Sequence, residues 1–410
     1  MTCIVDMHNV FEVNVPSSKS LSNRWLVLQH LSGGCIELNN LSTADDTVLM
    51  RDLLSSLSDS AHNVNTFHCD NAGTVARFIT AVLSITEGHH IVTGSSRMKR
   101  RPIAPLVDAL VEMGATIDYI EQKGYFPLSI VGKPLQGGRV HIDSSQSSQF
   151  VSALMLIAPF LPNGLSITID HHMVSESYIS MTAHVLCQAG IEVQYSANEI
   201  HIASGMPMSG TVDIEPDWSS VAYLYNWVLF SGKPLYVAGV GHTSSQGDRV
   251  VADIYRQLGV DTTYIYDGIM LQRSDVALSS FRYNFIDCPD LVPALVVACA
   301  GLGIVANFDG LNTLPYKETD RIKVLAYELN KLNVQISCSA NSLSIIPCIG
   351  AMVSDNHISL SSHNDHRMAM AFSAFRFLLP HVDISISNPE CVSKSFPNYW
   401  HEMKHYCSII

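Results

Sequence analysis

Apolar residues recur at helical spacing in several separate stretches of the chain, and these stretches stop at residues that tolerate a left-handed backbone. One predicted helix is marked by the apolar positions Ile103, Leu106, Val107, Leu110 and Met113. It stops at Gly114, and comparable patterns stop at Gly190, Gly259 and Asn333, because Gly and Asn accept positive φ at a helix end. The stops are spaced by 76, 69 and 74 residues, which indicates a repeated supersecondary unit.

Another set of helical patterns begins just after small or polar clusters, near residues 18, 71, 147, 219, 290 and 364. Strand-like runs alternate with both sets of helices. The sequence therefore predicts an α/β protein of six βαβαββ-like units, three in each of two lobes. The expected lobe I consists of residues 1–17 plus 217–410, and lobe II of residues 18–216. Polar helix starts from both lobes are expected to line a cleft between them and to bind a ligand with several anionic groups.

The motif Lys317-Glu318-Thr319-Asp320-Arg321 precedes a pattern of apolar residues at helical spacing. We expect Lys317 and Arg321 on one face of a helix start, where two cations and unpaired N–H groups favour an anion. Glu318 between them supplies an acid or a base. A solvated charge cluster at a helix start explains the same motif equally well.

Other polar clusters also have an ordinary interpretation beside a functional one. The basic run at residues 97–101 resembles a solvated loop or a nuclear-localisation patch as well as an anion site. Ser147 and Ser148 are typical helix caps, and Asp290 is a typical N-cap. His366, within the run 364–367, is by itself a structural histidine more often than a catalyst.

Composition narrows the class of protein. The 410 residues are 47% hydrophobic and 15% charged, which is typical of a globular, core-rich chain. A net charge of −13 argues against nucleic-acid or anionic-membrane partners. We interpret the charge-free run at residues 291–308 as a buried helix, a turn and a strand, not a membrane span. Ten scattered cysteines and an N-terminus without signal-peptide features predict a reduced, cytoplasmic location.

The sequence lacks the glycine-rich, Walker-type and His-Glu-x-x-His motifs of nucleotide and zinc sites. We therefore expect neither a cofactor nor a metal. The remaining chemistry is anion binding combined with carboxyl and amino acid/base groups. A group transfer between two anionic small molecules fits this chemistry best.

Seven motifs occur in an order that resembles the family of 5-enolpyruvylshikimate-3-phosphate synthase, or 3-phosphoshikimate 1-carboxyvinyltransferase. They are the runs at 18–24 (SKSLSNR), 71–74 (NAGT), 97–102 (RMKRRP), 147–150 (SSQF), 317–321 (KETDR), 364–367 (NDHR) and 394–397 (KSFP). The resemblance spans about residues 12–400. It implies a fold of two inside-out lobes. It also implies transfer of the enolpyruvyl group of phosphoenolpyruvate to the 5-hydroxyl of shikimate 3-phosphate, with release of phosphate.

The resemblance also implies residue roles. Asp290 is expected to accept the hydroxyl proton, Glu318 to donate a proton, and Lys19 to contact both substrates. The implied shikimate 3-phosphate ligands are Lys19, Ser20, Arg24, Ser147, Ser148, Gln149, Ser175, Tyr178, Asp290, Thr313 and Lys317. The implied phosphoenolpyruvate ligands are Lys19, Asn71, Gly73, Arg97, Gln149, Arg321, His366, Arg367 and Lys394.

Two positions depart from the family pattern. Thr313 stands where the family often has Asn, and Phe78 stands where many members have Pro. Gly73 is the residue found in members that glyphosate inhibits, so we expect inhibition competitive with phosphoenolpyruvate. The alternatives are a UDP-N-acetylglucosamine enolpyruvyl transferase and a non-catalytic small-anion binding protein on the same fold. The resemblance alone implies a monomer.

Overall fold

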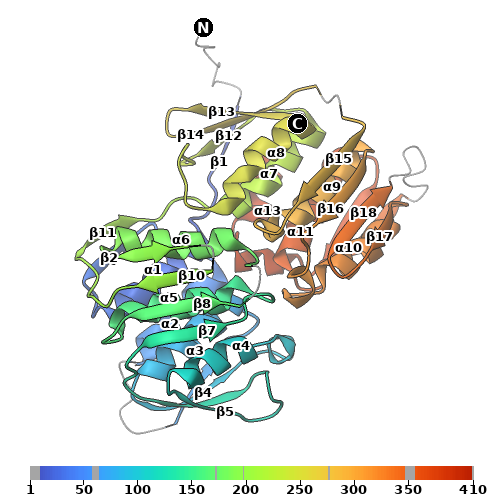
Figure 1. The fold of residues 1–410 in the computed structure, drawn as a ribbon. Coiled ribbons are helices and arrows are strands. Elements are labelled where there is room, and N and C mark those ends of the chain that lie inside the picture. The colour runs from blue at the N-terminus through green and yellow to red at the C-terminus, as the bar shows by residue number, and fades with distance from the viewer. Residues whose placement is uncertain are drawn as a thin grey trace. The chain divides into compact units, whose positions relative to one another are not determined.

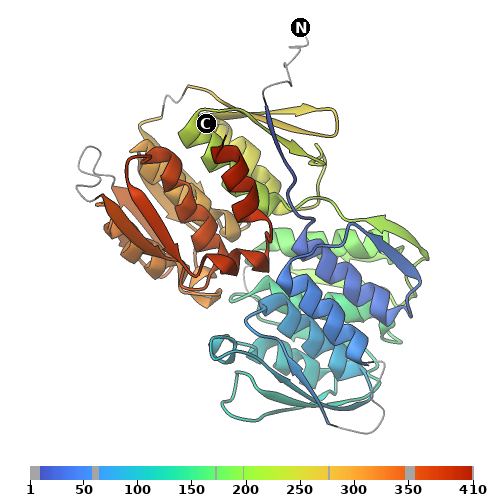
Figure 2. The same ribbon diagram turned by 180° about the vertical axis from the view of Figure 1, so that it is seen from behind.

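The structure is a computed structural model that describes residues 10–57, 64–170, 173–196, 198–275, 278–346 and 356–408. The chain forms two compact units (Figures 1 and 2). Unit 1 comprises Met1–Ser17, Glu215–Pro315 and Thr319–Ile410, and unit 2 comprises Ser18–Ile214 and Tyr316–Glu318. The short segment Tyr316–Glu318 therefore belongs to a different unit from the residues on either side of it.

Both units are built from copies of one βαβαββ motif. In each complete copy two strands pair in parallel, and a later hairpin adds two antiparallel strands to the second of them. In unit 2 the strands, in sheet order, are β3 (Asn65–His68), β4 (Gly88–Thr93), β6 (Leu128–Gly132) and β5 (Thr116–Tyr119), then β7 (Gly138–Ile142), β8 (Leu165–Ile169), β10 (Glu199–Ile202) and β9 (Val193–Tyr195).

Unit 1 repeats this order twice. Its sheets are β1 (Phe11–Val13), β12 (Leu235–Ala238), β14 (Gly268–Arg273) and β13 (Val260–Ile265), then β15 (Ser280–Asn284), β16 (Val305–Asp309), β18 (Ser342–Ile346) and β17 (Gln335–Cys338). Each unit also has a parallel pair: β11 (Gly210–Asp213) with β2 (Ile36–Asn39), and β19 (His357–Ser361) with β20 (Asp383–Ser387). The predicted fold class is confirmed. Among the described residues, however, two of the six repeats contribute two-stranded sheets in place of four-stranded ones.

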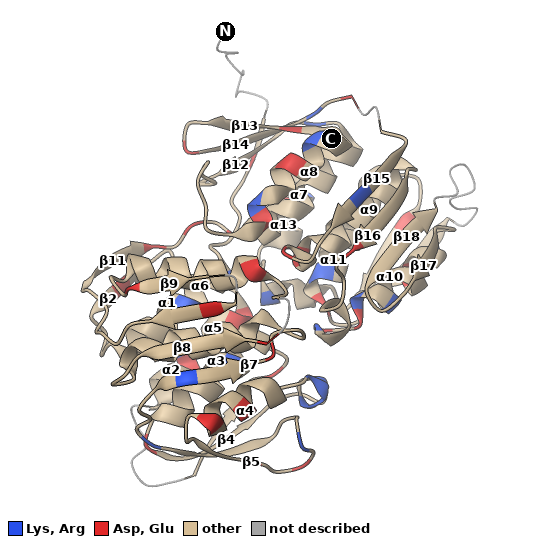
Figure 3. Cartoon of the chain, in the orientation of Figure 1, with Lys and Arg blue, Asp and Glu red and all other residues tan. Residues whose placement is uncertain are grey.

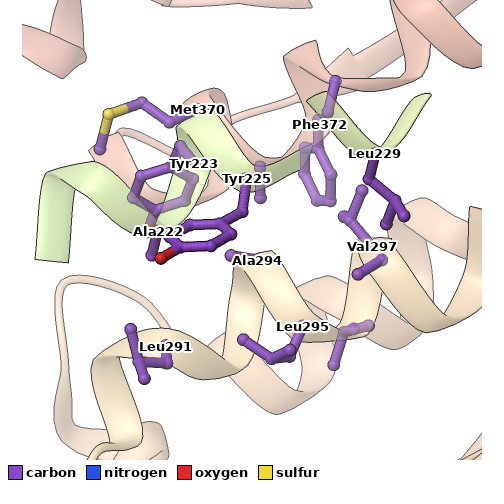
Figure 4. Packing of buried hydrophobic residues seen from close by; sticks show 14 of the residues in the cluster. Ala222, Tyr223, Tyr225, Leu229, Leu291, Ala294, Leu295, Val297, Met370 and Phe372 are labelled. Carbon is purple, nitrogen blue, oxygen red and sulfur yellow. The ribbon is translucent and has the colours of Figure 1, made fainter. Parts of the chain in front are cut away.

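One helix from each repeat packs at the centre of its unit. These central helices are α1 (Lys19–Leu31), α3 (Gly73–Ile85) and α5 (Ser148–Ile157) in unit 2, and α7 (Trp218–Ser231), α9 (Val292–Leu302) and α11 (His366–Ser373) in unit 1. In unit 1, Figure 4 shows Ala222 of α7, Ala294 of α9 and Phe372 of α11 among the buried residues where these helices pack together. A helix that is surrounded on all sides is stable when it is apolar all round, as α9 is. This explains the charge-free run of residues 291–308, which forms α9, a turn and β16.

The remaining helices cover the sheets or close the chain. They are α2 (Asp45–Ser56), α4 (Ala104–Glu112), α6 (Glu176–Gln188), α8 (Val251–Leu258), α10 (Arg321–Asn330), α12 (Phe375–Leu378) and α13 (Tyr399–Cys407). The predicted stops after α4, α6, α8 and α10 are confirmed. Gly114, Gly190, Gly259 and Asn333 have φ of 95°, 83°, 92° and 56°. None of the helices in the described part is long and apolar enough to cross a membrane.

The start of α10 corrects one prediction. The helix begins at Arg321, because the Asp320 side chain caps it by accepting a hydrogen bond from the Lys323 N–H at 3.3 Å. Lys317 and Glu318 precede this cap and lie in non-helical backbone. Lys317 and Arg321 therefore do not share a helix face, although they are four residues apart.

Candidate functional site

The central helices of unit 2 bring several predicted site residues together at their N-terminal ends. Ser147 caps α5 by accepting a hydrogen bond from the Gln149 N–H at 3.2 Å. The Gln149 side-chain amide donates to the Thr74 hydroxyl, also at 3.2 Å, so the first turns of α5 and α3 are joined. At the start of α1, Lys19 forms an ion pair with Asp46 of α2 at 3.1 Å.

Arg24 lies inside unit 2 between α1, α5 and α6, with 2% of its surface exposed. Its guanidinium donates to the hydroxyls of Thr182 at 2.8 Å and Ser152 at 3.2 Å. It also donates to the carbonyls of Ser20 and Tyr178, two residues predicted to share its site. Burial lowers the pKa of Arg24 to about 10, against a smaller opposing effect from Tyr178.

Gly73 is the first residue of α3 and lies against the guanidinium of Arg101. A Cβ atom on Gly73 would overlap that guanidinium, so a residue with a side chain would displace it. Arg101 donates to the carbonyl of Asn71 at 3.0 Å and to that of Tyr316 at 3.0 Å. The predicted residues Asn71 and Gly73 therefore both contact Arg101. This arginine stands in the motif at 97–102, but we had assigned it no role.

The basic run at 97–101 holds the segment Tyr316–Glu318. Arg97 donates to the Lys317 carbonyl at 2.7 Å and to the Glu318 carbonyl at 3.1 Å. Figure 3 shows Lys and Arg concentrated in the turn next to the start of α4. The solvated-loop interpretation is thus wrong for Arg97 and Arg101, while Lys99 does lie at the surface, where it pairs with Glu121. These contacts tie Glu318, the predicted acid, to unit 2.

Two further predicted residues lie at the start of α6. Ser175 is its N-cap residue, buried, with a left-handed backbone at φ 55°. A non-glycine residue pays about 1–2 kcal/mol for that conformation, so its position is fixed by the surroundings. Tyr178 follows one turn later and offers its carbonyl to Arg24. Ser148, the first residue of α5, is also buried.

Unit 2 therefore contains three buried arginines whose described hydrogen-bond partners are all neutral. Arg24 and Arg77 are 2% exposed and Arg101 is 4% exposed. Arg77 donates to the Pro102 carbonyl at 2.6 Å, and burial, together with Arg101, lowers its pKa. The charge of Glu318 opposes this shift in part. Burying several cations close together is costly, and an anion bound beside them lowers that cost. The arrangement favours binding of acidic ligands by this unit, despite the chain's net negative charge.

In unit 1, four charged residues from three elements form one network. Arg321, at the start of α10, pairs with Asp290 at 2.7 Å and with Asp365 at 2.8 Å. Arg367, in the first turn of α11, pairs with the other oxygen of Asp290 at 3.0 Å. Asp365 caps α11 by accepting from the Arg367 N–H at 3.0 Å. Asp290 itself lies in the 3₁₀ turn Pro289–Leu291. Because it pairs with two arginines, it is not a simple helix cap.

A further carboxyl group, Asp248, lies beside this network. It belongs to the 3₁₀ turn Gly247–Val250, and one of its oxygens accepts a hydrogen bond from Ser219 at the start of α7. Its other oxygen is buried without a described partner. Burial, with the nearby charge of Asp290, raises the pKa of Asp248 to about 6, and Arg367 opposes this shift.

The other predicted residues of unit 1 lie around the same elements. His366 is buried as the first residue of α11, next to Asp365. Lys394 ends the 3₁₀ segment Pro389–Lys394, which packs against α11. The Thr313 side chain is buried in the loop after β16, and its hydroxyl has no described partner.

Sequence reasoning missed five charged residues of these two clusters. Arg101 and Asp365 stand inside motifs that we singled out, so a signal for them existed. Arg77 follows Gly73 by one helical turn and gave a weaker signal. Asp46 and Asp248 gave none, because their partners lie 27 and 29 residues away in the chain.

Comparisons with known proteins agree on one family. The sequence model of EPSP synthase (3-phosphoshikimate 1-carboxyvinyltransferase) matches residues 10–403. The 3-phosphoshikimate 1-carboxyvinyltransferase of Bacteroides fragilis (strain YCH46) is 36% identical over 395 residues, covering 96% of this chain and 94% of the relative. The protein of that name from Sulfurovum sp. (strain NBC37-1) is 34% identical over 420 residues, covering 97% and 96%.

Solved structures show the same fold. EPSP synthase from Acinetobacter baumannii superposes with a TM-score of 0.72 at 22% identity, covering 97% of this chain and 96% of that one. The enolpyruvyl transferase NikO from Streptomyces tendae superposes with a TM-score of 0.70 at 13% identity, covering 97% and 94%. At these identities the structures support the fold alone.

Proposed function

The chain belongs to the EPSP synthase (3-phosphoshikimate 1-carboxyvinyltransferase) family and transfers the enolpyruvyl group of phosphoenolpyruvate to shikimate 3-phosphate, and we propose that the two residue clusters described above both serve this reaction. The observation that carries the assignment for unit 2 is its set of buried arginines with neutral partners. Two acidic substrates would add negative charge beside these arginines.

The reaction proceeds by addition and elimination. The 5-hydroxyl oxygen of shikimate 3-phosphate bonds to C2 of phosphoenolpyruvate, while its proton passes to Asp290 and C3 gains a proton from Glu318. C3 then returns a proton to the Glu318 carboxylate, the double bond re-forms, and the bond from C2 to the phosphate oxygen breaks, so that its electron pair leaves with phosphate. A placed acid and base each contribute about 10²- to 10⁴-fold to such steps.

The ion pairs of Asp290 suggest how the base is prepared. Arg321 and Arg367 both contact its carboxylate. An adjacent arginine favours the ionised form of a carboxyl group. When these arginines bind phosphoenolpyruvate, they turn from Asp290 to the substrate, and Asp290 becomes a better proton acceptor. His366 and Lys394 would complete this anion site.

In unit 2 the helix starts would hold shikimate 3-phosphate. Ser147, Ser148 and Ser175 offer hydroxyls and backbone N–H groups to its phosphate, with Lys317 as an added cation. Ser20, Arg24 and Tyr178 bind its carboxylate, and Thr313 of unit 1 contacts its ring. Lys19 and Gln149 reach both substrates, while Asn71, Gly73 and Arg97 face phosphoenolpyruvate. No metal or cofactor enters this scheme, and we propose that the chain acts as a monomer in the cytoplasm.

Two conservative variants test the roles of the carboxyl groups. Asp290→Asn and Glu318→Gln should each lower kcat at least about 100-fold, while calorimetry still detects binding of shikimate 3-phosphate. Asp253→Asn, at an exposed position on α8, serves as a control for the loss of one negative charge and should retain full turnover. Normal turnover by Asp290→Asn would refute the assignment of the base.

The two alternatives make different predictions. A UDP-N-acetylglucosamine enolpyruvyl transferase would release phosphate from phosphoenolpyruvate only with the UDP-sugar. A non-catalytic binding protein would release none with either acceptor. The comparisons favour neither alternative.

A further inference from the structure

Glu328, on α10, is a buried carboxylate outside the proposed reaction scheme. It is 0% exposed, yet both of its oxygens are engaged. One oxygen accepts from Lys331 at 2.6 Å and from the Ser361 N–H at 2.9 Å. The other shares a hydrogen bond with the His363 imidazole at 2.8 Å. A buried charge with this many partners is built into the fold, because its desolvation must be offset.

Two partners of Glu328, Ser361 and His363, lie on the segment that leads into α11, and the third, Lys331, is the C-cap residue of α10. Ser361 ends β19, and His363 lies in the short connection before Asp365. Lys331 also donates to the carbonyl of Ser359 in β19, at 3.1 Å. Glu328 therefore fixes the beginning of the connection that delivers Arg367.

The same connection is held at its other end by the same helix. Arg321, at the start of α10, pairs with Asp365. Seven residues separate Arg321 from Glu328, so the two attachment points lie about 10 Å apart along the helix. Helix α10 thus holds the connection at both ends, once through an arginine and once through a glutamate.

This connection needs such support because its backbone is strained. His363 and Asn364 are consecutive non-glycine residues with φ of 51° and 58°. Left-handed backbone costs about 1–2 kcal/mol for a residue such as His363, and it persists only where the surroundings fix it, whereas Asn364 tolerates it better. Side-chain oxygens of Ser361 and Ser362 accept from the N–H groups of His363 and Asn364, both at 3.2 Å. These serines orient the turn, and Glu328 attaches it to α10.

We propose that Glu328 is a positioning residue, which orients Arg367 toward phosphoenolpyruvate by fixing the Ser361–Asp365 connection to α10. This inference rests on the proposed role of Arg367 as a ligand of phosphoenolpyruvate. Glu328 itself contacts no residue assigned to substrate. Its effect must therefore pass through Asp365 and Arg367.

Glu328→Gln tests the proposal with little change in shape. Glutamine still accepts from the Ser361 N–H but loses the negative charge that Lys331 and His363 share. We expect the KM for phosphoenolpyruvate to rise about tenfold, while the KM for shikimate 3-phosphate changes less than about twofold. Lys323→Gln is the matched control, because it removes an ion pair of α10 whose lysine is 82% exposed and pairs with Asp320. It should leave both constants unchanged.

A double-mutant cycle separates positioning from general stabilisation. If Glu328 acts through Arg367, adding Glu328→Gln to Arg367→Lys should raise the KM for phosphoenolpyruvate less than about threefold further. An equal increase in both backgrounds, or a parallel increase in both KM values, would overturn the proposal. If wild type shows no turnover, or if Arg367→Lys leaves the KM for phosphoenolpyruvate unchanged, the proposed function itself is contradicted.

His363→Asn keeps the experiment informative if Glu328→Gln does not fold. Asparagine tolerates the left-handed backbone at this position but cannot reach Glu328. We expect a selective increase of about threefold in the KM for phosphoenolpyruvate. An unchanged KM in this variant would also count against the proposal.

Discussion

Replacing Asp248 by asparagine is expected to make the stability of the protein less dependent on pH. In the native state this carboxyl group is buried beside Asp290, and its pKa rises from 3.8 to about 6. Between these two values the folded protein binds more protons than the unfolded chain. Stability therefore falls as pH rises through this window. Asparagine does not titrate, so the variant lacks this component.

The size of the effect follows from the shift. A shift of about two pKa units corresponds to about 3 kcal/mol when the whole window is crossed. Between about pH 4.5 and about pH 8 the contribution of Asp248 is about 2 kcal/mol, because part of the titration lies below pH 4.5. As pH rises over that interval, the free energy of unfolding of the variant should therefore fall by about 2 kcal/mol less than that of wild type.

Urea unfolding at several pH values, followed by circular dichroism, measures this difference directly. Only the change in unfolding free energy with pH is compared between the two proteins. Any pH-independent effect of the asparagine amide, such as a changed hydrogen bond to Ser219, therefore cancels. Asp253→Asn controls for net charge. Identical pH dependence in wild type and Asp248→Asn would refute the reasoning, and so would a steeper loss in the variant.

Three further predictions concern ligand binding. Gly73→Ala should displace Arg101 and raise the KM for phosphoenolpyruvate about tenfold, with little change in the KM for shikimate 3-phosphate. Steady-state constants equal to those of wild type would contradict the contact. Phe78→Leu removes the ring whose centroid lies 5.5 Å from the Arg24 guanidinium carbon. The affinity for shikimate 3-phosphate, measured by calorimetry, should fall about three- to tenfold. An unaltered affinity would show that the ring does not support Arg24. Glyphosate should inhibit competitively with phosphoenolpyruvate, and full activity at millimolar glyphosate would count against the family-based expectation.

Local features of the fold were predictable because they depend on neighbours in sequence. Helix stops at Gly114 and Asn333 follow from the conformational preference of single residues, and the structure places both in left-handed backbone. The repeat followed from the spacing of such stops. The start of α10 was misplaced because the apolar pattern marks the helix but not its first residue, and the capping bond of Asp320 sets that residue at Arg321.

The site was predictable only where chemistry gathered in short motifs. The arginine–aspartate network was partly predictable, since Arg321, Arg367 and Asp290 carried family signals. Asp46 and Asp248 were not, because a pair between distant residues leaves no local pattern. The buried environment of Arg24 was equally hidden, since Thr182 and Ser152 lie 158 and 128 residues from it in the chain.

The most direct test of the account is to incubate the purified protein with phosphoenolpyruvate and shikimate 3-phosphate, and to follow phosphate and the acceptor by mass spectrometry. We predict one phosphate released for each acceptor that gains an enolpyruvyl group, and no reaction when UDP-N-acetylglucosamine replaces shikimate 3-phosphate. An unmodified shikimate 3-phosphate, or a modified UDP-sugar, would contradict the central claim.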